Sequence, residues 1–182
     1  MDRDRSELAT CTRCDLAATR QRVVIGSGPL RATLMVVGEA PGRTEDEGGE
    51  PFIGRSGRLL FELIEEEIGV TRAQCFVTNV VKCRPPNNRT PRRGELEACR
   101  PWLEAQLDLV APRVVVALGN TAARAVFGLV EGIGRTHGRL QRRGAVAGLA
   151  TYHPAAALRG GPGVVHAMRA DLRIVRDLLE TS

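Results

Sequence analysis

Residues 33–57, TLMVVGEAPGRTEDEGGEPFIGRSG, begin with an apolar run and continue into a loop rich in glycine, proline and acidic residues. The run at 33–37 is short and rich in valine, which is typical of a strand buried on both faces. A helix is predicted beyond the loop, over 56–69, from apolar residues at helical spacing, namely Leu59, Leu60, Leu63, Ile64 and Ile68. An irregular loop set between a buried strand and a helix usually carries function.

Three more apolar runs follow along the chain, at 75–81, 113–119 and 146–153. Helices are predicted after them, over about 92–111, from a cap at Asn120 or Thr121, and over about 163–180. Four short strands alternating with helices indicate an α/β protein whose parallel sheet is covered on both faces. A length of 182 residues suits one core, so residues 1–182 are interpreted as a single domain.

Composition and charge are those of a globular chain with a basic surface. Hydrophobic residues make up 43% and charged residues 26%, which argues against general disorder. The formal net charge is +5, and because Lys82 is the only lysine, arginine supplies nearly all of the positive charge. Two local clusters favour a nucleic-acid face, although a genome bias toward arginine explains the total equally well: Arg84, Arg89, Arg92 and Arg93, and Arg135, Arg139, Arg142 and Arg143.

The sequence shows no sign of a membrane segment. No apolar run approaches the ~20 residues of a spanning helix. The charged start, MDRDRSELAT, lacks the apolar core of a signal peptide. We therefore expect a cytoplasmic protein.

Polar side chains follow the predicted strands at the points where they end. Glu39, Asn79 and His153 each come directly after or at the end of a strand, and Gly119 ends another. Ligands bind at the carboxyl ends of parallel strands, so we expect these side chains to converge with Phe52 from the loop. A ring can stack on a flat heterocycle, and a carboxamide can offer one donor and one acceptor to its edge. Uracil presents the matching N3–H donor and O4 acceptor, whereas cytosine presents the reverse.

Cleavage of an N-glycosidic bond makes specific demands on such a pocket. Positive charge grows on the sugar and negative charge on the leaving base, so a carboxylate near the sugar and a donor near base oxygen O2 both help. Glu39 and His153 suit these two roles. Taken singly, each pocket residue has an ordinary alternative: a loop carboxylate, a core ring, a turn-forming asparagine and a surface histidine.

The five cysteines indicate a metal centre more than a disulfide framework. Their number is odd and no secretory signal precedes them. Cys11 and Cys14 form a Cys-x-x-Cys pair, and Cys83 and Cys99 flank the loop after the second strand. Four thiolates can hold zinc or an iron–sulfur cluster, and their spacing does not decide between the two. The alternative is that they are buried apolar side chains, which is what we expect of Cys75 inside a strand.

Long stretches, in order, carry a family resemblance: CTRCDL, VVGEAPGRTEDEGGEPFIGRSGRLL, VTNVVKCRPPNNRTP, EACRPWL, VVVALGNTAA and TYHPAAALR. Together they span nearly the whole chain and resemble the family 4 uracil-DNA glycosylases, the iron–sulfur branch of the uracil-DNA glycosylase superfamily. The resemblance implies a three-layer α/β/α sandwich with a central four-stranded parallel sheet. It also implies a monofunctional hydrolase that flips uracil out of DNA and leaves an abasic site.

The resemblance assigns roles to single residues. Glu39 and His153 match catalytic positions. Four residues match uracil-binding positions: Ala40 through its backbone, Glu45 by crowding the C5 position against thymine, Phe52 by stacking, and Asn79 by reading the base edge. A [4Fe–4S] cluster is implied on Cys11, Cys14, Cys83 and Cys99.

Other expectations concern the DNA and the rest of the loop. Leu158 and Arg159 are candidates for filling the space that the flipped nucleotide leaves. The substrate is expected to be uracil-containing DNA, single- or double-stranded, and the protein is expected to be a monomer. The other loop acids, Asp46, Glu47 and Glu50, are interpreted as solvated, and His137 as a surface residue near DNA.

Two other activities are compatible with this fold. One superfamily subgroup traps uracil-DNA covalently through a histidine in a loop insertion, but residues 80–98 contain no histidine, so turnover is expected. The other is a non-catalytic iron–sulfur DNA-binding module on the same fold. Such a module would have no need of the full set of Glu39, Asn79 and His153.

Overall fold

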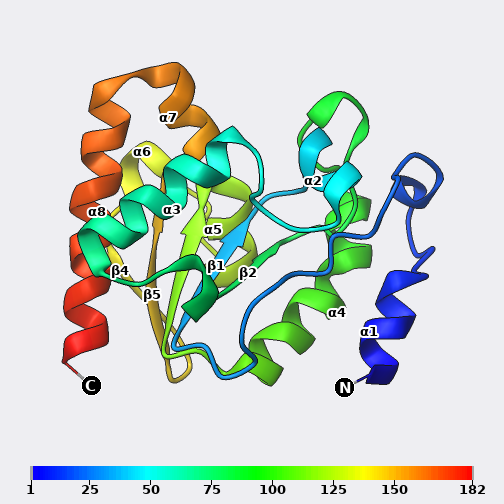
Figure 1. Cartoon of the computed structure of the whole chain (residues 1–182), viewed down its shortest axis with the longest axis horizontal. Helices are drawn as coiled ribbons and strands as arrows, with labels where there is room; N and C mark the ends of the chain where they lie inside the picture. Colours follow the sequence, from blue (N-terminus) through cyan, green and yellow to red (C-terminus); the bar gives the residue numbers. More distant parts are fainter. Residues whose placement is uncertain (1, 182) are drawn as a thin grey trace.

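The computed structural model describes residues 2–181, which form a central sheet with helices packed on both faces (Figure 1). The sheet has five strands in the order β2-β1-β3-β5-β4. The strands are β1 (Leu34–Gly38), β2 (Cys75–Asn79), β3 (Val114–Leu118), β4 (Leu140–Arg143) and β5 (Val146–Thr151). β1 pairs in parallel with β2 and β3, and β3 pairs in parallel with β5. The α/β class and the four predicted parallel strands are confirmed.

The prediction of a four-stranded, wholly parallel sheet missed one strand. β4 lies at the edge and runs antiparallel to β5, with Arg143 paired with Val146. Gly144, in the tight turn between them, has φ +57, which favours glycine. Residues 140–143 read LQRR and are half exposed, so no apolar run signals this edge strand. The sheet is therefore mixed and has five strands.

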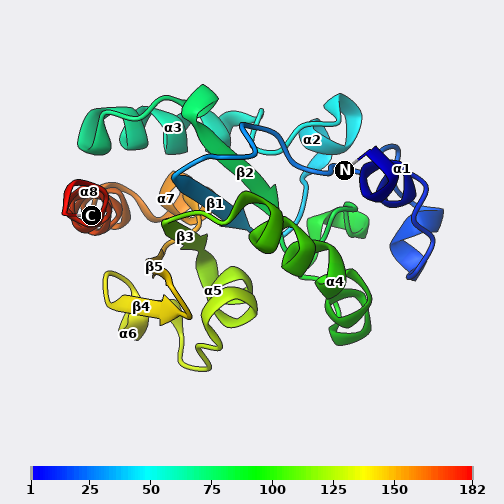
Figure 2. The ribbon, with the colours of Figure 1, turned by 90° about the horizontal axis from the view of Figure 1, so that it is seen from below.

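Helices cover both faces of the sheet. Alternate residues of β1 point to opposite sides: Leu34 and Val36 enter one core, and Met35 and Val37 enter the other. The first core packs against α3, α7 and α8, and the second against α4 and α5 (Figure 2). This arrangement confirms the three layers.

The helices of the described residues are α1 (Asp2–Ala9), α2 (Arg43–Gly48), α3 (Arg55–Ile68), α4 (Arg93–Val110), α5 (Gly119–Phe127), α6 (Ile133–Thr136), α7 (Pro154–Gly160) and α8 (Pro162–Glu180). Short 3₁₀ turns lie at Asp15–Ala18, Arg72–Gln74 and Pro86–Asn88. Among these helices, none has both the length and the apolar character needed to cross a bilayer.

Two helix starts differ from the prediction. α5 begins at Gly119 with Leu118 as its N-cap, so the expectation of a cap at Asn120 or Thr121 was wrong. Both side chains are used elsewhere, because Asn120 Oδ1 accepts a hydrogen bond from the Ile133 N–H, 2.7 Å away, and Thr121 donates to Glu39. α7 was not predicted at all, since seven residues with three successive alanines show no helical periodicity.

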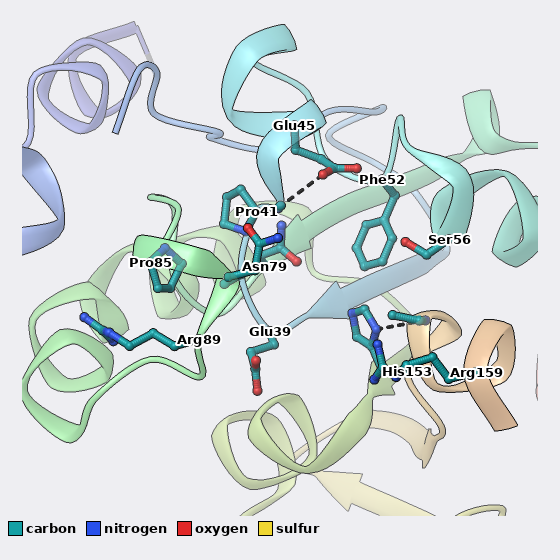
Figure 3. A pocket seen from close by; sticks show the side chains of 14 residues that line it. Glu39, Pro41, Glu45, Phe52, Ser56, Asn79, Pro85, Arg89, His153 and Arg159 are labelled. Carbon is teal, nitrogen blue, oxygen red and sulfur yellow. Dashed lines mark hydrogen bonds between the residues drawn. The ribbon is translucent and has the colours of Figure 1, made fainter. Parts of the chain in front are cut away.

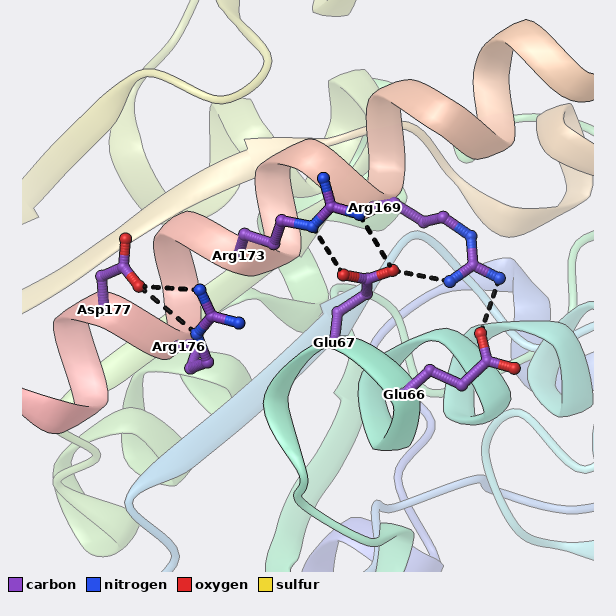
Figure 4. Close-up of polar contacts among 6 residues, drawn as sticks. All are labelled: Glu66, Glu67, Arg169, Arg173, Arg176 and Asp177. Carbon is purple, nitrogen blue, oxygen red and sulfur yellow. Dashed lines mark hydrogen bonds and ion pairs between the residues drawn. The ribbon is translucent and has the colours of Figure 1, made fainter.

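Ion pairs join α3 to α8 (Figure 4). Glu67 on α3 lies 2.6 Å from Arg169 Nη1 and 2.7 Å from Arg173 Nε, both on α8. Arg169 also contacts Glu66 at 2.6 Å. The two arginines lower the pKa of Glu67, with Arg173 contributing most, so the carboxylate stays ionised. The network holds α8, and with it the preceding α7, against α3.

Candidate active site

A cavity of about 320 Å³ opens at the carboxyl ends of β1, β2 and β5 (Figure 3). Its volume is at the small end of the range for ligand pockets. The structure brings to it most of the residues predicted from the sequence: Glu39, Ala40, Glu45, Phe52, Asn79, His153 and Arg159. Arg89, from one of the two arginine clusters of the sequence, also lines the cavity. The remaining lining residues, which sequence reasoning did not single out, are Pro41, Gly42, Ser56, Pro85, Asn88 and Ala155.

The floor of the cavity is built where β1 and β2 end side by side. Gly38 pairs with Asn79 in the sheet, and a Cβ atom at Gly38 would lie 2.4 Å from both Asn79 Oδ1 and Phe52 Cζ. Only glycine therefore lets the amide and the ring come this close. Asn79 is 1% exposed, and its Oδ1 has no hydrogen-bond partner among the described residues. A buried acceptor without a partner is costly unless a ligand satisfies it.

Phe52 is held rigidly beside this floor. Its backbone has φ +56, a left-handed conformation that is strained for an aromatic residue. Gly57, in the first turn of α3, packs so tightly on the Phe52 backbone that a Cβ there would lie 1.8 Å from its carbonyl oxygen. The Phe52 ring lies 5.9 Å from the His153 ring, centroid to centroid, at 34°. The ring is thus a fixed wall of the cavity.

His153 is the N-cap of α7, and its protonation state follows from its contacts. The Ala155 N–H donates to His153 Nδ1 at 3.2 Å, so in the neutral ring the proton sits on Nε2. Burial, and secondarily the charge of Arg159, lower the pKa of His153 to about 4. The ring is therefore a neutral hydrogen-bond donor at physiological pH.

This state can be measured by NMR in the protein labelled with ¹⁵N-histidine. We predict that His153 remains neutral, with its proton on Nε2, at about pH 6, where an unperturbed imidazole is mostly charged. The chain has three histidines, and the signal that is lost in a His153→Gln variant identifies His153. An imidazolium at His153 at that pH would contradict the assignment.

Glu39 follows β1 directly and is partly buried. Its Oε2 accepts a hydrogen bond from the hydroxyl of Thr121, in the first turn of α5. No ion pair to Glu39 is found among the described residues. The carboxylate therefore lines the cavity as an acceptor that no cation neutralises.

Of the three acids of α2, Asp46 differs from what the sequence indicated. Glu45 lines the cavity, and its carboxylate accepts hydrogen bonds from the backbone N–H groups of Gly42, at 3.1 Å, and Gly54, at 2.9 Å. It thereby ties the two ends of the loop together. Asp46 was interpreted as solvated, which was wrong: it is 1% exposed and accepts from the backbone N–H groups of Gln21 and Arg22. Glu47 and Glu50 are exposed, as expected.

Leu158 and Arg159 lie near the end of α7. Arg159 lines the cavity, whereas Leu158 does not and is 45% exposed. An exposed leucine beside a polar cavity is available for contact with a partner. His137, interpreted as a surface residue, is half-buried: its Nδ1 lies 3.1 Å from the buried Asp171 carboxylate, and its ring packs on Tyr152.

The four predicted ligand cysteines lie close together: Cys11 and Cys14 follow α1, Cys83 follows β2, and Cys99 lies on α4. Cys83 and Cys99 belong to a small buried cluster with Leu16 and Trp102, and Cys11 and Cys14 pack against it. Cys75 lies apart, buried in β2, and burial raises the pKa of its thiol to about 12. The prediction that Cys75 is a buried residue within a strand is confirmed.

The surroundings of these sulfurs fit an anionic iron–sulfur group. Arg20 donates to Cys83 Sγ at 3.4 Å, and the Lys82 N–H donates to Cys99 Sγ at 3.3 Å. The buried indole N–H of Trp102 has no partner among the described residues. Such N–H donors stabilise cluster sulfurs. As they stand, the side chains of the described residues form no group of three or more His, Cys, Asp or Glu arranged to hold a metal ion.

The burial of Lys82 was not predicted from the sequence. Lys82 is fully buried, and its Nζ lies 2.7 Å from Thr78 Oγ1, 2.5 Å from the Asn79 carbonyl oxygen and 2.7 Å from Gln106 Oε1. Burial lowers its pKa to about 7. The only lysine of the chain thus lies between the cysteine cluster and the backbone of Asn79. That Lys82 is the only lysine in an arginine-rich sequence was the one feature that could have indicated a special position.

Known proteins resemble this chain over most of its length. The model of the uracil DNA glycosylase superfamily matches residues 25–173. A type-4 uracil-DNA glycosylase of Sulfurisphaera tokodaii is 37% identical over 100% of this chain and 86% of its own. Those of Pyrobaculum aerophilum and Thermotoga maritima are 45% and 44% identical, over 84% and 82% of this chain and 81% and 78% of theirs. With these matches and the geometry of the cavity, the chain belongs to the uracil-DNA glycosylase superfamily, in its family 4 branch.

Proposed function

We propose that this protein is a monofunctional uracil-DNA glycosylase, a hydrolase of DNA repair that removes uracil and leaves an abasic site. The observation that carries the proposal is the buried, unpartnered Oδ1 of Asn79 beside the Phe52 ring. Uracil N3–H is a donor that would satisfy this oxygen, and the Asn79 amide N–H can donate to O4. Cytosine presents an acceptor at N3 and would leave the same oxygen unsatisfied, at a large cost.

Hydrolysis is assigned to two other groups that line the cavity, Glu39 and His153. As the C1′–N1 bond breaks, its electron pair moves to the base, and the neutral His153 Nε2–H donates to O2, where negative charge grows. The Glu39 carboxylate stabilises the positive sugar and orients the water whose oxygen bonds to C1′. The proton released by that water leaves through Glu39, and the uracil anion takes a proton from solvent.

Discrimination against thymine and base flipping are assigned to residues at the edge of the cavity, Glu45, Leu158 and Arg159. Glu45, fixed by two backbone N–H groups, is proposed to occupy the space that a C5 methyl group would need and so to reject thymine. A base inside a duplex must be rotated out of the stack to reach such a site. The exposed Leu158 and the adjacent Arg159 are proposed to fill or support the vacated space.

A [4Fe–4S] cluster on Cys11, Cys14, Cys83 and Cys99 is proposed as a structural cofactor. When bound, it links the N-terminal segment to the loop and helix that follow β2, and it takes no part in hydrolysis. Because its binding free energy is also folding free energy, its loss destabilises the fold.

The role of the cysteines is testable without an activity assay. A Cys99→Ser variant is expected to lose the brown colour, the iron and the sulfide of the purified protein and to melt at a lower temperature. Cys75→Ala is the matched control, since Cys75 is buried apart from the four, and it should keep the iron. Equal iron contents in Cys99→Ser and the wild type would contradict the assignment.

The class of reaction is tested by the mass of the DNA product. Simple hydrolysis yields an unbroken strand that has lost uracil and gained the elements of water, together with free uracil. A strand cut by the enzyme would indicate lyase activity, and a protein–DNA adduct would indicate a covalent trap. Unchanged DNA with tight, salt-sensitive binding would favour the non-catalytic module. The monomeric state, the cytoplasmic location and the single-domain organisation remain predictions.

A further inference from the structure

The first turn of α5 contacts both side chains that the proposed reaction uses, His153 and Glu39. Gly119, with φ +82, packs against His153 so closely that a Cβ there would lie 3.3 Å from the His153 Cβ. Two residues later, Thr121 Oγ1 donates to Glu39 Oε2. α5 follows β3, which pairs with β1, so the sheet itself brings these segments together.

The Thr121 hydroxyl has no competing use within its helix. The N-cap of α5 is Leu118, and no side chain caps the helix. Among the described residues, Thr121 is the one side chain that hydrogen-bonds the Glu39 carboxylate, and no arginine, lysine or histidine forms an ion pair with it. In Figure 3 the Glu39 side chain extends from the end of β1 toward α5. Its orientation therefore depends on this one donor.

We propose that Thr121 is a positioning residue for catalysis: its hydroxyl fixes Oε2 of Glu39 and leaves Oε1 free for the water or the sugar. This inference rests on the proposed function of Glu39. Thr121 touches neither base nor sugar and acts only through Glu39.

The test compares single-turnover uracil release by Thr121→Val, which keeps the shape and removes the donor, with Thr121→Ser, which keeps the donor. We expect Thr121→Val to lower the single-turnover rate constant at saturating enzyme about 10- to 100-fold, with the half-saturating enzyme concentration nearly unchanged, as for the loss of one hydrogen bond to a charged group. Thr121→Ser should stay within about threefold of wild type. Thr136→Val is the matched control, because the Thr136 hydroxyl donates to the Gly132 carbonyl in α6, away from the cavity.

A double-mutant cycle separates positioning from a general effect on the fold. In a Glu39→Gln background, Thr121→Val should cost little further activity, because the group it orients no longer carries charge. Equal losses in both backgrounds, a Thr121→Val enzyme as fast as wild type, or a Thr121→Ser enzyme as slow as Thr121→Val would each overturn the inference. A wild-type chain that released no uracil would instead remove the proposed function, and this inference with it.

Discussion

Replacement of Glu39 by glutamine is expected to slow uracil release by about 10²- to 10⁴-fold, the range for a group that transfers protons or orients water in the transition state. Glutamine keeps the length of the side chain and can still accept the Thr121 hydrogen bond. It carries no negative charge, however, so it neither stabilises the positive sugar nor takes the proton from water. DNA binding and melting temperature should stay near wild type, because no ion pair involving Glu39 is lost.

Glu47→Gln is the control for this experiment. Glu47 lies on α2, in the same loop region, and among the described residues its one ion pair is the exposed pair with Arg43, four residues earlier. Such pairs contribute little to stability. The control should therefore keep full activity, and a Glu39→Gln enzyme as fast as this control would show that Glu39 has no catalytic role.

Asn79→Ala is expected to reduce kcat/KM for uracil-DNA by about 10²- to 10³-fold, comparable with the loss of one preorganised active-site contact. Alanine removes both the acceptor for N3–H and the donor for O4, and it leaves space beside Phe52 that water can enter. The backbone of β2 should be unaffected, because the carbonyl of residue 79 still accepts from Lys82. Base release by one round of enzyme on a uracil oligonucleotide gives the measurement.

Gln74 supplies the control for Asn79. It is an exposed carboxamide at the opposite end of β2, where its Oε1 accepts from the Thr71 N–H. Gln74→Ala should change local stability slightly and leave uracil release intact. If Asn79→Ala released uracil as fast as Gln74→Ala, the amide would not be the base reader.

Much of the fold could be predicted because its strands are buried on both faces. Runs such as LMVVG and VVVAL have no polar face, so their apolar character shows in the sequence. β4 and α7 could not be predicted in the same way. β4 is an edge strand that backbone pairing with β5 stabilises. α7 is a helix of seven residues that its packing against α3 and α8 stabilises. Neither carries a periodic pattern of its own.

The candidate site was predictable where position in the fold decides it. Glu39, Asn79 and His153 stand at strand ends, and the strand order brings them to one cavity. The residues that hold them in place were not predictable. Thr121 forms a hydrogen bond with Glu39, 82 positions away in the sequence, and Asp46 forms one with the backbone of Gln21, 25 positions away. Such partners depend on how distant segments pack, and no local pattern encodes them.

The most direct measurement uses three oligonucleotides that differ at one position, which holds uracil, thymine or cytosine. Each is incubated as a single strand and as a duplex with the purified wild-type protein, and alkali then cuts any abasic site. We expect cleavage at uracil, opposite either adenine or guanine, while the thymine and cytosine strands stay intact. This is the result predicted if the Asn79 amide recognises the base edge and Glu45 excludes the C5 methyl group of thymine. Intact uracil strands, although the protein carries its cluster and binds the DNA, would contradict the proposed activity.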